Sequence, residues 1–233
     1  MSALWGMIPA AGAGARMGGE TPKQYLPLAG STVLEQSLQA LLDTPGMLGI
    51  SVALDALDQH AAKLPLLADS RVFRVLGAAE RSGSVLAGLG VLLEHAEADD
   101  WVLVHDAARP CVGAQDIATL IATVSRSGVG GLLAAPVVDT VKRADARGRV
   151  TETLDRNTLW RAQTPQMFRL GELYAAIEQA CARGLAVTDE ASAMELAGHP
   201  VQLVASSAEN IKVTVAADLP LAEFYLGQRE LTR

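Results

Sequence analysis

A loop of small residues carrying two basic side chains follows the first apolar run of the chain. Gly and Ala let backbone N–H groups approach phosphate oxygens closely, and Arg16 and Lys23 add positive charge. Because ligands of open α/β sheets bind where strands end, the loop indicates a phosphate site, although a flexible turn is the alternative. The loop begins with the small residues Pro9, Ala10, Ala11, Gly12, Ala13 and Gly14.

The spacing of this loop disfavours two common nucleotide motifs. Gly12, Gly14 and Gly18 are one residue too widely spaced for a dinucleotide fingerprint, and no acidic residue ends a strand about 20 positions later. No Gly-Lys-Ser/Thr sequence is present, so a P-loop is also disfavoured. A dinucleotide-dependent oxidoreductase is therefore an unlikely class for this chain.

A second candidate segment follows the expected strand 72–76. Here the backbone of Gly77, Ala78 and Ala79 and the hydroxyl of Ser84 could reach a bound base. The same pattern is typical of an ordinary helix start, since Ser is a preferred N-cap. The local sequence does not decide between the two.

A third segment, His105 to Pro110, follows the expected strand 101–104. It places the carboxylate of Asp106 at a strand end, where it could bind Mg²⁺ or a ribose, with Ala107 beside it. A local Asp106–Arg109 salt bridge is the alternative. His105 is more typical of a structural histidine than of a catalytic one.

Three polar residues further along could bind an anion: Thr140, Arg156 and Thr164. Lys212 lies between Ile211 and Val213, so a strand over 211–213 would turn it away from these apolar neighbours. A surface lysine is the default interpretation, and a catalytic lysine is the interpretation if it meets the other basic residues.

The elements that must position these residues alternate between strands and helices. This alternation predicts a mostly parallel sheet with helices on both faces. Strands are expected at 4–8, 49–54, 72–76, 101–104, 129–135, 201–204 and 211–213. Helices are expected after Ser31 and at 57–67, 82–94, 115–125, 170–183, 190–196 and 217–226.

Strands over 137–143 and 149–154 predict a hairpin whose composition is polar. An isolated two-stranded hairpin is marginal in water. It is therefore either a solvated excursion or an arm that packs on a second subunit.

Composition narrows the function classes. The chain has 233 residues, half of them hydrophobic, which excludes intrinsic disorder. A net charge of −7 disfavours non-specific nucleic-acid binding. The two cysteines make no disulfide framework, no apolar run is long enough for a membrane helix, and the N-terminus lacks the basic flank of a signal peptide. We expect a cytoplasmic protein.

Six blocks of the sequence resemble, in order, those of the 2-C-methyl-D-erythritol 4-phosphate cytidylyltransferase family. They are PAAGAGARMG with PKQY, ERSGSVLAGL, VHDAARP, the DTVKR to DRNTLWRAQTPQ arm, TDEASAMEL and ENIKVT. The pair VHDAARP and LWRAQTPQ is much more specific than the Gly-rich loop. The sequence departs from the family pattern at Ala78, Gly83 and Glu209, where Gly, Asp and Asp are frequent.

The resemblance implies a Rossmann-like nucleotidyltransferase fold, a three-layer sandwich with a protruding β-arm. Residues 1–233 would form one domain, with 137–155 as the arm of a homodimer. The enzyme would transfer the cytidylyl group of CTP to methylerythritol phosphate and release pyrophosphate, using Mg²⁺, in the non-mevalonate isoprenoid pathway.

The resemblance also implies roles for the candidate residues. Arg16, Lys23 and Lys212 would be catalytic, and Arg109, Thr140, Arg156 and Thr164 would bind the acceptor. Mg²⁺ would be held mainly by the CTP phosphates, with Asp106 as a possible ligand. The residues implied to bind CTP are Pro9, Ala10, Ala11, Gly12, Ala13, Gly14, Gly77, Ala78, Ala79, Ser84, Asp106 and Ala107.

Two other functions stay open at this point. A cytidylyltransferase for another polyol phosphate, such as ribitol 5-phosphate, would share the nucleotide half of the site. An inactive nucleotide-binding or scaffold protein would be expected to lack a basic site residue, yet Arg16, Lys23 and Lys212 are all present.

Overall fold

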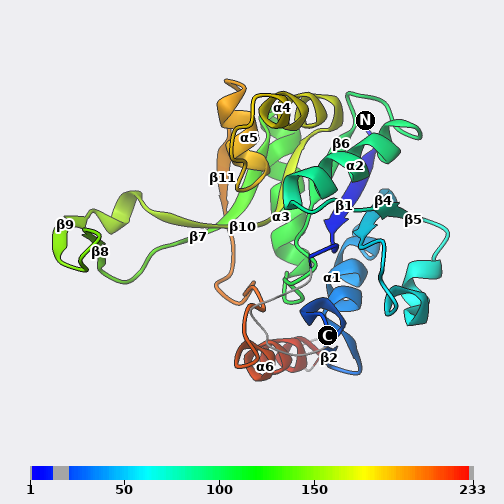
Figure 1. Ribbon diagram of the computed structural model, residues 1–233, viewed down its shortest axis with the longest axis horizontal. Coiled ribbons are helices and arrows are strands. Elements are labelled where there is room, and N and C mark those ends of the chain that lie inside the picture. The colour runs from blue at the N-terminus through cyan, green and yellow to red at the C-terminus, as the bar shows by residue number, and fades with distance from the viewer. Residues whose placement is uncertain (1, 13–20, 231–233) are drawn as a thin grey trace.

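The computed structural model describes residues 2–12 and 21–230, with a seven-stranded sheet at the centre. The strand order is β11-β7-β10-β6-β1-β4-β5, and only β10 runs antiparallel to its neighbours. The expected α/β class with a mostly parallel sheet is confirmed (Figure 1). The strands are β1 (Leu4–Pro9), β4 (Met47–Leu54), β5 (Val72–Leu76), β6 (Trp101–Val104), β7 (Gly131–Pro136), β10 (Trp160–Arg169) and β11 (Gln202–Ala205).

Helices cover both faces of this sheet, which makes three layers (Figure 1). Side chains alternate across β1: Leu4 and Ile8 pack with α1 and α3, whereas Trp5 and Met7 pack with α2, α4 and α5. The two resulting cores hold the strand ends rigidly. The helices of the two faces are α1 (Val33–Leu42), α2 (Arg81–Leu93), α3 (Ala114–Ser127), α4 (Leu170–Ala182) and α5 (Glu190–Leu196).

The N-cap of α1 lies one residue after the expected cap, Ser31. Thr32, in the short strand β3 (Ser31–Thr32) that pairs with β2 (Pro27–Leu28), caps the helix by accepting a hydrogen bond from the Glu35 N–H at 3.2 Å. The hydroxyl of Ser31 instead donates to the Glu35 carboxylate. Both contacts stabilise the same helix start.

The C-terminal helix α6 (Asp218–Glu230) packs through Ala222 on Leu28, Val33, Cys111 and Val213. A cavity of about 480 Å³ lies between α1, α3 and α6, and none of the expected site residues lines it. Within the described residues, no helix combines the length and the apolar character that spanning a membrane requires.

The expectation of a helix over 57–67 is wrong. The segment forms two 3-10 turns, Ala61–Lys63 and Pro65–Ala68. Pro65 lacks a backbone N–H and disfavours helical geometry in the residue before it, so one continuous helix cannot form.

Two further differences concern strands. No strand was expected at β10, which lies in the middle of the sheet between β6 and β7. The expected strand at 211–213 is not formed, although the Val213 N–H donates to the Ala108 carbonyl at 2.8 Å. The segment that carries Lys212 is thereby held beside the loop that follows β6.

The expected hairpin is confirmed, with shorter strands than expected. β8 (Val141–Ala144) and β9 (Val150–Leu154) pair with each other alone and project well away from the sheet (Figure 1). At the arm and its base, Val138, Val150 and Trp160 are exposed by 70%, 62% and 39%.

Candidate active site

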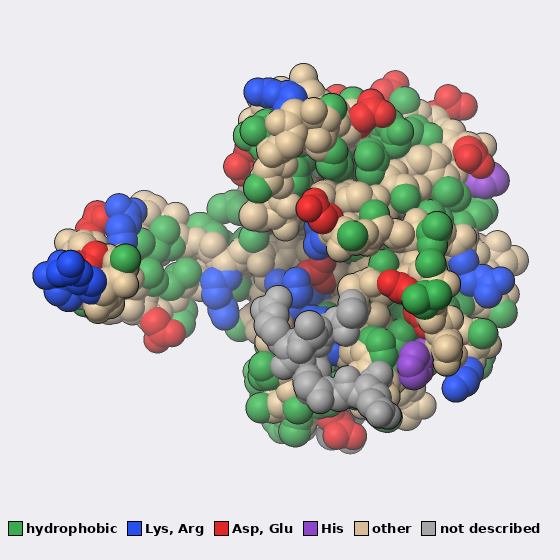
Figure 2. Space-filling view, viewed as in Figure 1, with side chains coloured by type: hydrophobic (Ala, Val, Ile, Leu, Met, Phe, Trp, Pro, Cys, Tyr) green, Lys and Arg blue, Asp and Glu red, His purple; other side chains and the backbone are tan. Residues whose placement is uncertain are grey.

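A cavity of about 380 Å³ opens at the carboxyl ends of β1, β5 and β6. It collects most of the residues expected to bind CTP, together with Lys23 and Lys212. Figure 2 shows basic and acidic side chains close together on one face of the molecule. Ala13, Gly14 and Arg16 lie outside the described residues. The lining residues are Pro9, Ala10, Ala11, Gly12, Lys23, Gln24, Ala78, Ala79, Glu80, Arg81, Ser84, Asp106, Ala107, Ala108, Lys212 and Thr214.

Gly77 does not line the cavity but is required by the close approach of two loops. A Cβ at this position would lie 2.4 Å from the Ala11 Cβ, closer than real Cβ atoms come. The loops after β1 and β5 therefore pack directly on each other. Their contact defines one wall of the cavity.

The Ser84 hydroxyl lies in the cavity wall and is engaged with its own loop. It accepts a hydrogen bond from the Ala78 N–H at 2.9 Å and also contacts the Ala78 carbonyl at 3.1 Å. Ser84 therefore lines the cavity, as expected for a residue near a bound base, and its hydroxyl also holds the loop at the start of the helix. A Cβ at Gly83 would lie 2.8 Å from the Ala78 Cβ, so the two departures from the family pattern are sterically coupled.

Gln24 holds the loop that follows β1 and was not among the expected site residues. Its amide nitrogen donates to the carbonyls of Ala10 and Gly12 at 2.9 and 3.1 Å, and the residue is buried. These two bonds fix the loop's backbone against the wall of the cavity. The only sequence signal was a polar residue directly after Lys23.

Asp106 is the electrostatic centre of the cavity. Its Oδ2 lies 2.7 Å from Lys212 Nζ, and its Oδ1 lies 3.0 Å from Arg81 Nη2. Burial opposes ionisation of the carboxyl, but Arg81 and Lys212 outweigh it and hold the pKa well below its usual range. Asp106 is thus a carboxylate at neutral pH.

Arg81 was not among the expected site residues. Its guanidinium also contacts both oxygens of the buried Glu190, at 2.7 and 3.2 Å. Burial lowers the pKa of Arg81, but Glu190 and Asp106 more than compensate and raise it. Arg81 is the first residue of α2, where the helix dipole disfavours a cation. An arginine at this unfavourable position was the one feature of the sequence that could have indicated a role for Arg81.

Lys23 and Lys212 meet on one side of the cavity. Lys23 Nζ donates to the Val213 carbonyl at 3.1 Å, next to Lys212 in the chain. The lysine of the first loop and the lysine near the C-terminus therefore face the same space. This meeting is the condition under which the sequence favoured a catalytic Lys212.

Thr164 and His105 support Asp106 from inside the protein. The Thr164 hydroxyl accepts a hydrogen bond from the Asp106 N–H at 3.0 Å and lies 3.0 Å from His105 Nδ1. His105 Nε2 lies 3.0 Å from the Arg109 carbonyl, which can only accept, so this nitrogen carries the proton. Burial lowers the pKa of His105 to about 4, consistent with a neutral, structural imidazole.

The four residues expected to bind the acceptor do not line the cavity. Thr164 is buried in the network just described, and Arg109 donates to the carbonyls of Asn210 and Ala162 at 2.7 and 3.3 Å. In this structure the Thr164 hydroxyl and the two terminal nitrogens of Arg109 have protein partners, whereas the buried Arg109 Nε has no hydrogen-bond partner. Thr140 and Arg156 are exposed at the base of the arm, where Arg156 donates to the Val138 carbonyl at 2.6 Å.

The residues present fit a Mg²⁺ ion that is held largely by its ligand. Among the described residues, no three His, Cys, Asp or Glu side chains come together in a way that could hold a metal. The cavity does contain the ionised Asp106, and Mg²⁺ commonly takes one or two carboxylates together with substrate phosphates.

A sequence profile of the 2-C-methyl-D-erythritol 4-phosphate cytidylyltransferase family matches residues 4–228. The chain belongs to this family. The cytidylyltransferases of this name from Pseudomonas aeruginosa PAO1 and Pseudomonas fluorescens Pf-5 are each 51% identical over 220 residues, which cover 94% of both chains.

Solved structures of cytidylyltransferases agree with the sequence match. A crystal structure of 4-diphosphocytidyl-2C-methyl-D-erythritol synthase superposes with a TM-score of 0.82 at 36% identity, covering 97% of this chain and 99% of the other. The Francisella tularensis 2-C-methyl-D-erythritol 4-phosphate cytidylyltransferase gives 0.79 at 36% identity, covering 96% and 100%. Family membership confirms the expected activity, cytidylyl transfer to 2-C-methyl-D-erythritol 4-phosphate in isoprenoid biosynthesis.

Proposed function

We propose that the cavity above β1, β5 and β6 is where this cytidylyltransferase binds CTP and carries out the transfer. The observation that carries the proposal is the convergence of Lys23, Lys212 and Asp106 on two loops of small residues. The backbone from Ala10 to Gly12 and from Ala78 to Ala79 would hold the base and the phosphates. The placement agrees with the rule that open α/β sheets bind ligands at the carboxyl ends of their strands.

The reaction needs no protein nucleophile. A phosphate oxygen of the acceptor attacks the α-phosphorus of CTP in line, the new P–O bond forms, and the bond to the β-phosphate breaks. Pyrophosphate leaves with the bonding electron pair. Catalysis then consists of positioning and of stabilising the charge on the pentacoordinate phosphorus.

Basic residues supply that stabilisation. Lys23 and Arg16 would face the reacting phosphorus and the leaving pyrophosphate, and Lys212 would bind the α-phosphate from the other side. The chain's net charge of −7 repels a polyanionic substrate, so these local charges must overcome the background. One preorganised donor contributes about 3 kcal/mol in a transition state.

Mg²⁺ would be bound mainly by the CTP phosphates, and Asp106 would be its protein ligand. When bound, the ion would neutralise phosphate charge. Asp106 would orient this ion or the ribose; Arg81 holds its carboxylate, and the Thr164 hydroxyl holds its backbone N–H.

The acceptor would be bound by residues from two subunits of a homodimer. Thr140 and Arg156 lie at the base of an arm that carries the exposed Val138, Val150 and Trp160. If the arm packs on a second copy, these apolar side chains are covered, and Thr140 and Arg156 reach the partner's cavity. Within this proposal, residues 1–233 act as one cytoplasmic domain, with 137–155 as its dimerisation arm.

Pyrophosphate release tests the specificity of the cavity. We expect turnover of methylerythritol phosphate with CTP to exceed that with UTP at least about tenfold, because buried backbone groups that match the cytosine amine are left unmatched by the uracil carbonyl. ATP and GTP should be poorer still. Equal rates with CTP and UTP would contradict the proposed base pocket, and equal rates with ribitol 5-phosphate as acceptor would favour the broader polyol phosphate activity.

A further inference from the structure

Arg81 is a bridge between two carboxylates that come from different parts of the chain. Its Nη1 lies 2.7 Å from Glu190 Oε1, while its Nε lies 3.1 Å from Asp106 Oδ1. Glu190 is the first residue of α5, and its side chain is only 1% exposed. Lys212 contacts Asp106 at the other oxygen, Oδ2. The four groups form one continuous chain of ion pairs, Glu190–Arg81–Asp106–Lys212.

Stability alone does not account for this chain. Removing charges from water costs more than an ion pair usually returns, and apolar side chains of similar size often stabilise a fold as well. Arg81 also stands at the N-terminus of α2, where the helix dipole opposes a cation. The chain of ion pairs is unfavourable for stability and ends at Lys212 in the cavity wall. These two features together point to a role in the reaction.

The geometry shows what Glu190 contributes. The guanidinium presents its Nη1 and Nη2 to Glu190 and its Nε and Nη2 to Asp106 Oδ1, so the two carboxylates share Nη2, while Asp106 Oδ2 contacts Lys212. Without the carboxylate of Glu190, Nη2 would be released to bind Asp106 Oδ2 as well, which gives the two-oxygen arrangement that Arg and carboxylates favour. Lys212 would then lose its partner and its position.

We propose that Glu190 is a positioning residue for cytidylyl transfer, which acts through Arg81 and Asp106 to set the place of the Lys212 ammonium in the cavity. This inference rests on the proposed role of Lys212 beside the α-phosphate. Glu190 itself lies behind Arg81 and is not among the residues that line the cavity.

The test is a double-mutant cycle between Glu190→Gln and Lys212→Ala, read as kcat with CTP and methylerythritol phosphate. We expect Glu190→Gln to lower kcat at least about tenfold in the wild-type background and less than about twofold in the Lys212→Ala background, because residues that act as a unit are not additive. Glu195→Gln, at an exposed position of the same helix, should leave kcat unchanged in both backgrounds.

A merely structural Glu190 gives a different result. The fold-change caused by Glu190→Gln would then be the same in both backgrounds, which would overturn this inference and leave the proposed role of Lys212 intact. If Lys212→Ala alone leaves kcat unchanged, the role of Lys212 and this inference are both overturned. If Glu190→Gln fails to fold, Arg81→Lys replaces it, because lysine keeps the positive charge but cannot contact two carboxylates through a planar guanidinium. Arg81→Lys must then lower kcat in the wild-type background and have little effect in the Lys212→Ala background.

Discussion

Lys212 Nζ and Asp106 Oδ2 lie 2.7 Å apart, although 106 positions separate the two residues in the chain. The contact joins the loop after β6 to the segment that leads into α6. It places the two residues that were ambiguous in the sequence in one cavity with Lys23.

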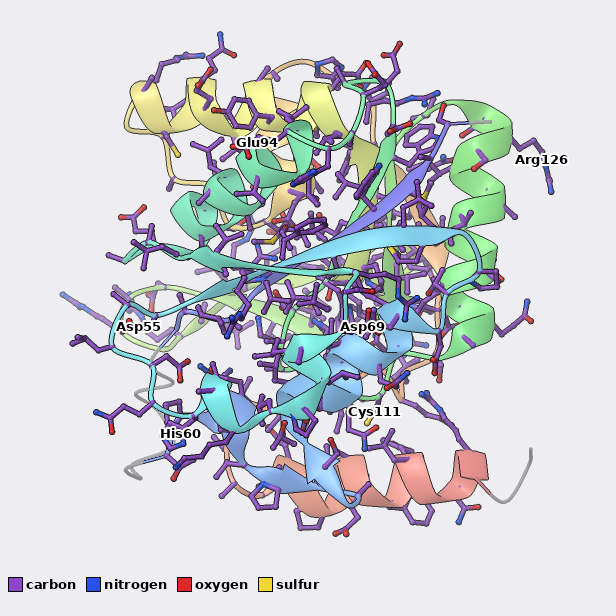
Figure 3. The ribbon with its side chains drawn as sticks, turned by 90° about the vertical axis from the view of Figure 1, so that its right-hand side faces the viewer. Asp55, His60, Asp69, Glu94, Cys111 and Arg126 are labelled. Carbon is purple, nitrogen blue, oxygen red and sulfur yellow. The ribbon has the colours of Figure 1, made fainter. Side chains whose placement is uncertain are left out.

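Replacing Lys23 tests the charge at the reacting phosphorus. We predict that Lys23→Ala lowers kcat at least about a hundredfold while the fold is kept, because a charge aimed at the phosphorus acts mainly in the transition state. Arg126→Ala removes an exposed cation of α3, remote from the cavity (Figure 3), and should leave kcat unchanged. Steady-state kinetics and thermal melting of both variants make the comparison; near-normal turnover of Lys23→Ala would remove this lysine from the mechanism.

Replacing Gly77 tests the contact between the two small-residue loops. Gly77→Ala would place a Cβ 2.4 Å from the Ala11 Cβ, so one loop must move. We predict a rise of about tenfold or more in the KM for CTP. The matched variant is Gly90→Ala in α2, whose added Cβ would meet Tyr174 at an ordinary 3.7 Å.

Gly90→Ala should keep the KM and raise the free energy of unfolding by about 0.5–1 kcal/mol, since Gly is the weaker helix former. The two loops would not form the nucleotide site if Gly77→Ala bound CTP as tightly as Gly90→Ala does.

Burial of His105 should make the free energy of unfolding depend on pH. The histidine is neutral in the folded protein down to a pKa of about 4, whereas in the unfolded chain it titrates near 6.5. The stability that comes from this difference in pKa is fully present above about pH 6.5. It is lost as the pH falls toward 4, because the unfolded chain then binds a proton that the folded protein does not. The free energy lost across this window is on the order of 3 kcal/mol.

Urea unfolding at pH 7 and pH 5 measures this effect. Wild type should lose about 2 kcal/mol more than His105→Asn between the two pH values, because the variant lacks the titrating group. An identical pH dependence of wild type and variant would mean that His105 is not held neutral by burial.

The sequence indicated many of the residues that line the cavity but not the strand beneath it. Each small-residue loop follows a short apolar strand, and the family resemblance assigned these loops to CTP, whereas the lining residues Gln24 and Arg81 were missed. β10 was missed because its buried positions include Gln163, Thr164 and Gln166, which are typical of a loop. These polar side chains are satisfied by distant partners such as Asp189 and Ser206, which no local spacing reveals.

The acceptor half could not be placed for a related reason. Arg109 and Thr164 have side chains suited to binding an anion, and in this structure they contact the Asn210 carbonyl and the Asp106 N–H, so their role toward the acceptor stays a prediction. The bridge from Arg81 to Glu190 spans 109 positions and was equally invisible. Residue type and local spacing indicate what a side chain can bind, whereas tertiary contacts decide what it does bind.

We propose that each active site combines the nucleotide cavity of one chain with the arm of another. Lys23 belongs to the cavity, and Arg156 lies at the base of the projecting arm. Lys23→Ala and Arg156→Ala homodimers should each be nearly inactive. A hybrid dimer of the two would contain one site with both lesions and one site with neither.

Subunit exchange between these two variants tests the claim most directly. The mixture should be about half hybrid, so activity should recover to roughly a quarter of that of wild type if the sites act independently. Exchange is verified by native mass measurement of differently tagged chains. If exchange is complete and no activity returns, both residues serve the same chain's site, and the composite active site is contradicted.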